Sequence, residues 1–229
     1  MFFYWDPTFL LILPGLLLAL YAQQKINSAY STYSRVSSQK GASGSQAARA
    51  LLERQGIYDV EVVMGKGQLS DHYDPRTKKV VLSPGVYQSD SLAALAVAAH
   101  ETGHAIQHNE AYLPLSLRTL MAPVVQIASN VAIPLFILGL FFSYTLTQVG
   151  IYLFAAVVLF QLVTLPVEFN ASRRAMAALE SQGFITTEEY PGAKSVLSAA
   201  ALTYVAAVMT SILQLMRLLI ISGAGRRRD

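Results

Sequence analysis

The feature that most constrains this chain is a run of 49 positions, from Thr119 to Val167, that contains no charged residue. A helix needs about 20 apolar residues to cross the hydrocarbon core of a bilayer, so this run can hold two crossings joined by a tight turn. We place the crossings at residues 124–142 and 151–166, with the turn at 143–150. The sequence therefore predicts a transmembrane hairpin over residues 119–166.

Two further apolar segments are candidate crossings. Residues 7–22 resemble an uncleaved anchor. A secretory signal peptide would begin with positive charge and end at a small-x-small cleavage site, and neither feature is evident here. The alternative for this segment is a buried helix of a soluble core. Residues 196–221 are rich in Ala, Ser and Thr, as in helices that pack closely in lipid. We expect a mainly α integral membrane protein with about four transmembrane helices.

The only long water-compatible region, residues 23–118, lies between the first and second crossings, so we expect a small α+β domain inserted there. Its pattern predicts a helix at 45–55, capped by Ser43 or Ser45, and strands at 60–64 and 79–82 in a hairpin or mixed sheet. A further helix is expected to start at Ser89 or Asp90 and to end near Asn109. The predicted division of the chain has five parts: an anchor (1–22), this α+β region (23–118), the hairpin (119–166), a polar helix (167–194), and a last membrane helix with a basic tail (195–229).

The second of these predicted helices carries the pattern His100-Glu101-Thr102-Gly103-His104, an HExxH motif. Residues four apart share one face of a helix, so both imidazoles can reach one metal ion while Glu101 projects beside it. The alternative, ordinary packed histidines, would leave polar groups unpaired in an Ala/Leu-rich helix, at a cost of several kcal/mol. Zinc suits two neutral imidazoles and one carboxylate, and thiolate sites are excluded because the chain has no cysteine.

A third ligand must come from elsewhere. His108 lies about 12 Å along the helix axis from His100, too far to share an ion with bonds near 2 Å, so we expect it to serve at the helix C-terminus. His72 is a secondary candidate for polarising a substrate. Glu168 is the first acidic residue after the hairpin, and two crossings return it to the side of His104. Its alternative role is an ion pair with Arg173 or Arg174.

Three segments, HETGHAIQH, LSDHYDPRTKKVVLSP and LPVEFNASRRA, resemble the YugP-type family of membrane zinc metallopeptidases. This is a gluzincin-like group that is distantly similar to the HtpX and CAAX-prenyl endopeptidases. The resemblance covers nearly the whole chain. It implies a zincin-like catalytic region, one zinc ion bound by His100, His104 and Glu168, and Glu101 as the catalytic carboxylate.

One departure from the related endopeptidases is visible. They typically carry an acidic residue shortly after the ligand glutamate, and Asn170 and Ser172 stand in that part of this chain. Such a carboxylate normally orients a zinc-bound histidine. The resemblance therefore does not identify which residue orients the histidines here.

The expected function is zinc-dependent hydrolysis of peptide bonds, with Glu101 as the general base for a water activated by the metal. Glu168 directly follows a crossing, and ten residues separate His108 from Thr119, so we expect membrane or membrane-proximal polypeptides as substrates. The strand at 79–82 is either a surface to which substrate pairs or an ordinary hairpin strand.

Other classes of function fit the sequence less well. A membrane scaffold with a structural zinc would use the same ligands but would not need Glu101. A transporter would need more polar residues within the crossings than the few scattered ones present. No basic stripe interleaved with aromatic residues suggests binding to nucleic acid.

Positive charge gives a conflicting indication of orientation. Ten Lys and Arg residues between Lys25 and Arg118 favour the cytoplasmic side for the α+β region, and we expect a protein of the bacterial cytoplasmic membrane whose active site faces the cytoplasm. Four full crossings would then place Arg226–Arg228 outside, against the same rule. Either residues 196–221 do not cross fully, or a long soluble region is a poor guide to orientation.

Overall fold

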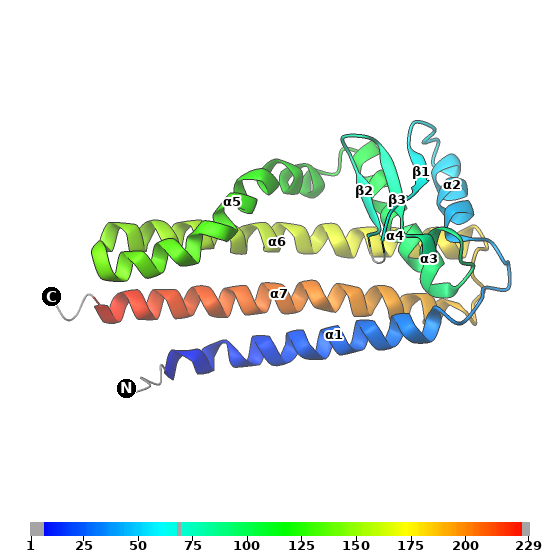
Figure 1. The fold of residues 1–229 in the computed structure, drawn as a ribbon. Coiled ribbons are helices and arrows are strands. Elements are labelled where there is room, and N and C mark those ends of the chain that lie inside the picture. Colours follow the sequence, from blue (N-terminus) through cyan, green and yellow to red (C-terminus); the bar gives the residue numbers. More distant parts are fainter. Residues whose placement is uncertain (1–6, 68–69, 226–229) are drawn as a thin grey trace. The chain divides into compact units, whose positions relative to one another are not determined.

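A computed structural model describes residues 7–67 and 70–225, with side chains up to residue 223 (Figure 1). The first six residues of the predicted anchor and the predicted basic tail at Arg226–Arg228 lie outside this description. The protein is mainly helical with one small sheet. Its elements are a 3-10 turn (Pro7–Leu11), α1 (Leu13–Tyr33), α2 (Gly44–Arg54), β1 (Glu61–Met64), β2 (His72–Asp74), β3 (Lys79–Leu82), α3 (Pro84–Tyr87), α4 (Leu92–Asn109), α5 (Leu113–Phe142), α6 (Tyr144–Ser181) and α7 (Tyr190–Gly225).

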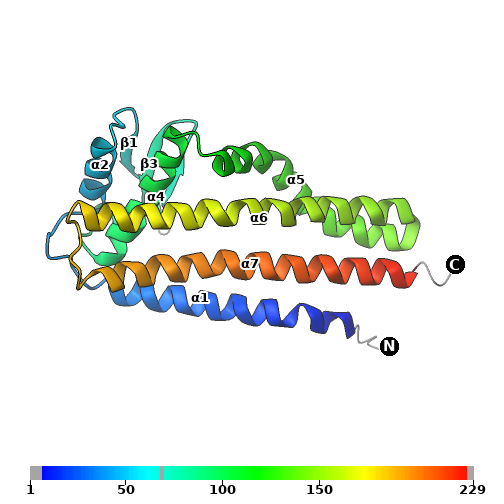
Figure 2. The same ribbon diagram turned by 180° about the vertical axis from the view of Figure 1, so that it is seen from behind.

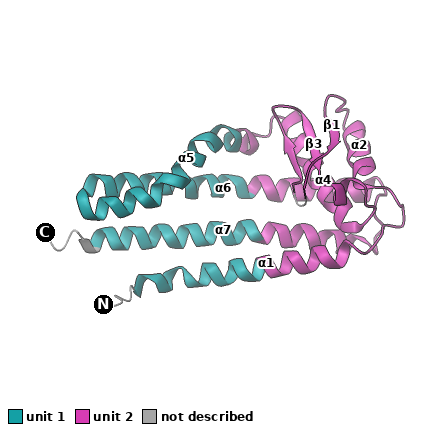
Figure 3. Cartoon of the chain, in the orientation of Figure 1, with its two compact units in different colours: residues 1–22, 117–165, 203–229 teal, residues 23–116, 166–202 magenta. Residues whose placement is uncertain are grey.

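The chain forms two compact units, each assembled from separate stretches of sequence (Figure 3). One unit, which we call the helical unit, contains residues 1–22, 117–165 and 203–229. The other, which we call the mixed unit, contains residues 23–116 and 166–202 and includes the whole sheet. The helices α1, α5, α6 and α7 each contribute residues to both units.

Three helices are long and apolar enough to cross a membrane: residues Leu113–Phe142, Tyr144–Ser181 and Tyr190–Gly223. Among the described residues, α1 does not meet this criterion. Its apolar segment ends at Ala22 and is followed by the polar sequence QQKINSAYSTY, so this segment is shorter than the roughly 20 residues that a crossing needs. Four crossings and an inserted domain therefore remain a prediction.

The turn between α5 and α6 is much shorter than predicted. We expected it to occupy residues 143–150, but α5 ends at Phe142 and α6 begins at Tyr144, so Ser143 alone lies between the helices. Glycines allow the two backbones to approach this closely. A Cβ added to Gly139 would lie 2.2 Å from the Thr147 nitrogen, and one added to Gly150 would lie 2.7 Å from the Phe136 nitrogen.

Within the helical unit, α1 and α7 run side by side (Figures 1 and 2). A Cβ on Gly15 would lie 2.8 Å from Oγ1 of Thr210. Small residues at such a contact let helices pack without the hydrophobic effect that drives packing in water. Thr210, one of the small residues of the Ala/Ser/Thr-rich α7, thus lies in close contact with α1.

The sheet of the mixed unit has the strand order β1-β3-β2. β1 pairs with β3 in parallel, with Glu61 opposite Lys79, and β2 pairs with β3 antiparallel, with His72 opposite Val81. Of the two alternatives for Lys79–Leu82, the structure contradicts a strand with a free edge for substrate, because this segment is β3 and pairs with a strand on both sides. β2 was not predicted, since its three residues lie inside a turn-rich sequence.

The core beneath the sheet is built by α4. Val80 and Leu82 of β3 are fully buried and cluster with Ala94, Ala98 and Ala105. The short alanine side chains let the sheet approach the helix, so α4 has one face against the sheet. Ser91 caps α4, accepting a hydrogen bond from the Ala94 backbone nitrogen, in place of the predicted Ser89 or Asp90. Ser43 caps α2, one of the two predicted residues.

Candidate metal centre

Two histidines of α4 present their rings to one point in the mixed unit. His100 and His104 are one helical turn apart, their ring centroids are 4.8 Å apart, and the rings are nearly perpendicular, at 83°. His104 is buried, with 8% of its surface exposed, and His100 is half-buried. The helix spacing therefore places two imidazoles next to each other at the edge of an otherwise apolar core.

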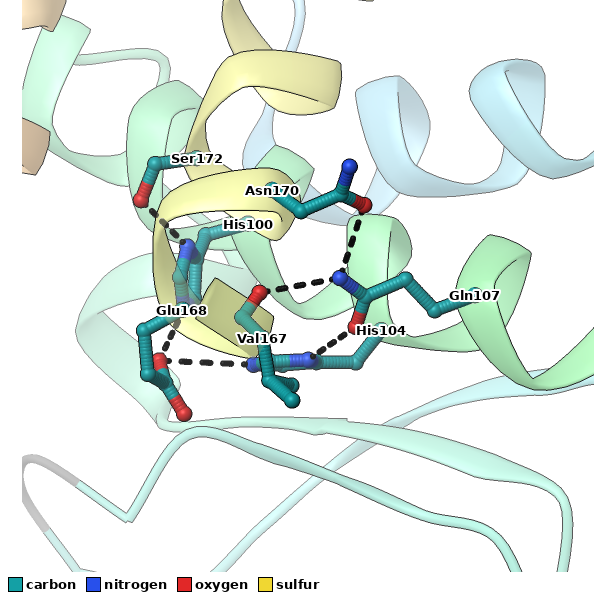
Figure 4. Close-up of polar contacts among 7 residues, drawn as sticks. All are labelled: His100, His104, Gln107, Val167, Glu168, Asn170 and Ser172. Carbon is teal, nitrogen blue, oxygen red and sulfur yellow. Dashed lines mark hydrogen bonds and ion pairs between the residues drawn. The ribbon is translucent and has the colours of Figure 1, made fainter. Parts of the chain in front are cut away.

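Glu168, on α6, supplies a carboxylate at the same point (Figure 4). Its Oε2 lies 3.2 Å from Nε2 of His100 and 3.6 Å from Nε2 of His104. The side chain is only 2% exposed. One potential ligand atom from each of the three residues lies within 4.8 Å of the others, although 64 positions separate His104 from Glu168 in the sequence.

A glycine between the two histidines makes this convergence possible. A Cβ on Gly103 would lie 2.8 Å from the carbonyl oxygen of Ala171 and 3.2 Å from its Cα. Both of these are backbone atoms, which cannot rotate away as a side chain could. The second variable position of the motif must therefore be very small for α4 and α6 to meet at Glu168.

The other ring nitrogen of each histidine contacts a neutral side chain (Figure 4). Nδ1 of His104 lies 3.0 Å from Oε1 of Gln107, and Nδ1 of His100 lies 3.1 Å from Oγ of Ser172. These contacts leave Nε2 of both rings directed at Glu168. Gln107 was not predicted. Only its position three residues after His104, on the same helix, could have indicated it.

Charge in the site is predominantly negative. Burial alone would lower the pKa of the His104 imidazole, but the carboxylates of Glu168 and Glu101 outweigh burial and raise this pKa. Two carboxylates beside two imidazoles thus favour a cation. Glu101 itself is half-buried and adjoins His100 on α4.

Two of the three separations between the donor atoms suit a zinc ion. Zinc bonds of about 2.0–2.1 Å in a tetrahedral arrangement place neighbouring donors about 3.3–3.4 Å apart. The two separations between Glu168 and the histidines, 3.2 and 3.6 Å, bracket that value. Two imidazole nitrogens and one carboxylate oxygen are also a donor set that zinc accepts, with a fourth position open.

The other two histidines lie outside this cluster of three. Nδ1 of His108 is 2.8 Å from the hydroxyl of Tyr73. Burial raises the pKa of Tyr73 to about 12, with Asp59 and Asp74 adding to the shift, so the phenol keeps its proton. His72 is exposed on β2, and its Nδ1 lies 2.7 Å from the Ser70 carbonyl oxygen.

Arg174, one of the two arginines that we considered as partners of Glu168, forms an ion pair with Glu110. Nη2 of Arg174 lies 2.7 Å from Oε2 of Glu110, at the end of α4. This contact lowers the pKa of the Glu110 carboxyl. Arg174 thus joins α6 to the C-terminal end of α4, and Glu168 faces the histidines.

A histidine pair on one helix and a buried glutamate from another form a possible metal site, which places the protein in the class of candidate metalloproteins. Comparison with known families agrees with this class. The chain belongs to the family described as "Putative neutral zinc metallopeptidase", whose model matches residues 8–223. It is 48% identical over 217 residues to a Bacillus subtilis (strain 168) protein named "Putative membrane protease YugP", covering 94% of this chain and 96% of that protein. No solved structure matches the chain.

Proposed function

We propose that this protein is a zinc-dependent membrane endopeptidase of the gluzincin type, with one zinc ion bound by His100, His104 and Glu168. The observation that carries the proposal is the convergence of these three donors, with separations of 3.2 and 3.6 Å that suit zinc. Membership of a zinc metallopeptidase family supports the same reaction class.

Glu101 is the proposed general base. When bound, zinc supplies a Lewis acid that activates water and polarises a peptide carbonyl. The Glu101 carboxylate accepts the proton of the attacking water and then donates it to the leaving amine. Support for this role comes from its place next to His100 on α4 and from the effect of its charge on His104.

The proposed substrates are polypeptides in or near a membrane. Glu168 lies on α6, the same continuous helix whose uncharged first part is a candidate crossing. Of the described strands, β2 pairs with β3 alone and contacts α4. An extended substrate could therefore pair along the outer edge of β2, next to the helix that carries the histidines.

The experiment is cleavage of an unfolded protein substrate by the full chain purified in detergent, compared with Glu101→Gln. The variant keeps all three proposed ligands but cannot accept the proton, so we expect full zinc content and cleavage reduced at least about 100-fold. Removing zinc from the wild type with a chelator should abolish cleavage, and adding zinc back should restore it.

Glu180→Gln is the matched control, because Glu180 is an exposed glutamate on α6 outside the cluster. It should retain both zinc and cleavage. If Glu101→Gln cleaves as fast as the wild type, Glu101 is not the base. If the zinc-loaded wild type cleaves nothing while zinc remains tightly bound, the alternative of a scaffold with a structural zinc is correct.

A further inference from the structure

A chain of hydrogen bonds links a partly exposed ion pair to the buried His104. It starts at Glu110, whose carboxylate contacts Nη2 of Arg174 at 2.7 Å. Nε of Arg174 donates to Oδ1 of Asn170 at 2.7 Å. Nε2 of Gln107 donates to the same Oδ1 at 2.9 Å, and Oε1 of Gln107 lies 3.0 Å from Nδ1 of His104. Figure 4 shows the inner part of this chain, from Asn170 to His104.

Every bond in this chain has only one possible direction. A guanidinium can donate hydrogen bonds but cannot accept them, so the Asn170 atom facing Arg174 must be the amide oxygen. That oxygen can only accept, so the Gln107 atom facing it must be the amide nitrogen. Nε2 of Gln107 also donates to the backbone carbonyl of Val167, at 2.9 Å, which is again an acceptor. The Gln107 amide therefore has one allowed orientation.

This orientation determines which nitrogen of His104 carries a proton. With Nε2 of Gln107 committed to two acceptors, its oxygen faces Nδ1 of His104 and requires a proton there. A neutral His104 then has its lone pair on Nε2, the atom that lies 3.6 Å from Glu168. Gln107 is fully buried, so bulk water does not offer a competing partner.

The contact at the other histidine does not have this property. Nδ1 of His100 faces the hydroxyl of Ser172, which can donate or accept. A hydroxyl therefore accommodates either tautomer of His100. Directional control is confined to His104, where the bonds lead back to a group that can only donate.

We infer that Gln107, Asn170 and Arg174 are positioning residues that hold His104 in the tautomer and ring orientation required to bind the metal. The inference rests on the proposed function, because it assigns these residues to the same zinc site. Asn170 lies in the part of the chain where the related endopeptidases typically carry an acidic residue. In this chain a neutral amide relay, with its direction set by Arg174, performs the orienting that a carboxylate would otherwise perform.

The test is the zinc affinity of the full chain in detergent, measured by competition with a chelator, together with the thermal stability of the metal-free protein. Gln107→Met removes both amide functions at similar volume, and we expect zinc to bind about 10- to 100-fold more weakly. Asn170→Leu should weaken binding less, because Val167 still orients Gln107. Asn170→Asp keeps an acceptor towards both neighbours and should bind zinc as the wild type does.

The outcomes separate this inference from the proposed function. If the wild type binds no zinc, the proposed function fails. If the wild type binds zinc and both Gln107→Met and Asn170→Leu bind it equally tightly, even at lower thermal stability, the relay only joins α4 to α6 and the inference is wrong. Should Gln107→Met not fold, the half-buried pair Asn170→Leu and Asn170→Asp decides: equal affinities overturn the inference. Gln88→Met, at an exposed glutamine of the mixed unit, should leave affinity unchanged.

Discussion

The residues that face the candidate metal differ in how much the sequence reveals about them. The motif spacing and the charge-free run singled out His100, His104 and Glu168, and the structure brings these three together. Their partners Gln107 and Ser172 were not predicted as such. Ser172 reaches its imidazole only because α6 packs on α4, whereas Gln107 lies three residues after His104 on α4, a spacing that by itself does not single out a partner.

Ser172→Ala removes the partner of Nδ1 of His100, so the ring keeps Glu168 as a hydrogen-bond partner but loses Ser172. The affinity for zinc should therefore fall about 10-fold. Ser172→Thr retains the hydroxyl and should retain most of the affinity. Ser181→Ala, an exposed serine at the end of α6, is the control for a lost hydroxyl. Equal affinity in Ser172→Ala and the wild type would show that Ser172 does not orient His100.

The elements that carry the site follow from local pattern, whereas their contacts do not. The strands predicted at 60–64 and 79–82 are observed at 61–64 and 79–82, and the helix predicted to end near Asn109 ends there. The middle position of β3 was not predicted, because it depends on β2, a strand of three residues that alternation cannot reveal. The single-residue turn at Ser143 was missed because the sequence does not show how closely Gly139 and Gly150 let two helices approach.

Gly103→Ala would force α6 away from α4, because the new methyl group would meet the Ala171 backbone at 2.8 Å. Overpacking of this kind costs about 1–3 kcal/mol, and displacement of Glu168 should also weaken zinc binding. Thermal unfolding and chelator competition measure the two effects.

Gly85→Ala is the matched substitution, since an added Cβ there meets nothing within 4 Å. It should change neither the unfolding temperature nor the zinc affinity appreciably. If Gly103→Ala behaves in the same way, close approach of α4 and α6 is not what positions Glu168.

At the scale of the whole molecule, the lack of charge over long stretches predicted the hairpin and the last membrane helix. Three of the described helices satisfy the requirements for a crossing. The apolar start of α1 is short, so its own length does not decide whether it spans a bilayer. The outcome depends on contacts with lipid and with neighbouring helices, which a hydropathy pattern does not describe. If α5 and α6 both cross, we expect the turn at Ser143 and the carboxylate of Glu168 on opposite sides of the membrane.

The absence of cysteine makes this topology directly testable. Single cysteines at exposed positions, Thr145→Cys near the turn and Glu53→Cys on α2, can each be treated with a membrane-impermeant maleimide. With the active site in the cytoplasm, Thr145→Cys should react in intact cells and Glu53→Cys only after permeabilisation. The reverse pattern would overturn the orientation, and reaction of both from the same side would contradict the hairpin.

The zinc content of Glu168→Ala, in the full chain purified in detergent, tests the central claim most directly. We expect about one zinc ion per wild-type chain, and a loss of most of it in Glu168→Ala, because two imidazoles alone are too few protein ligands for a stable zinc site. Glu180→Ala, on the same helix, should keep the wild-type content. Full zinc occupancy in Glu168→Ala would contradict the account, since the buried carboxylate would then not be a ligand.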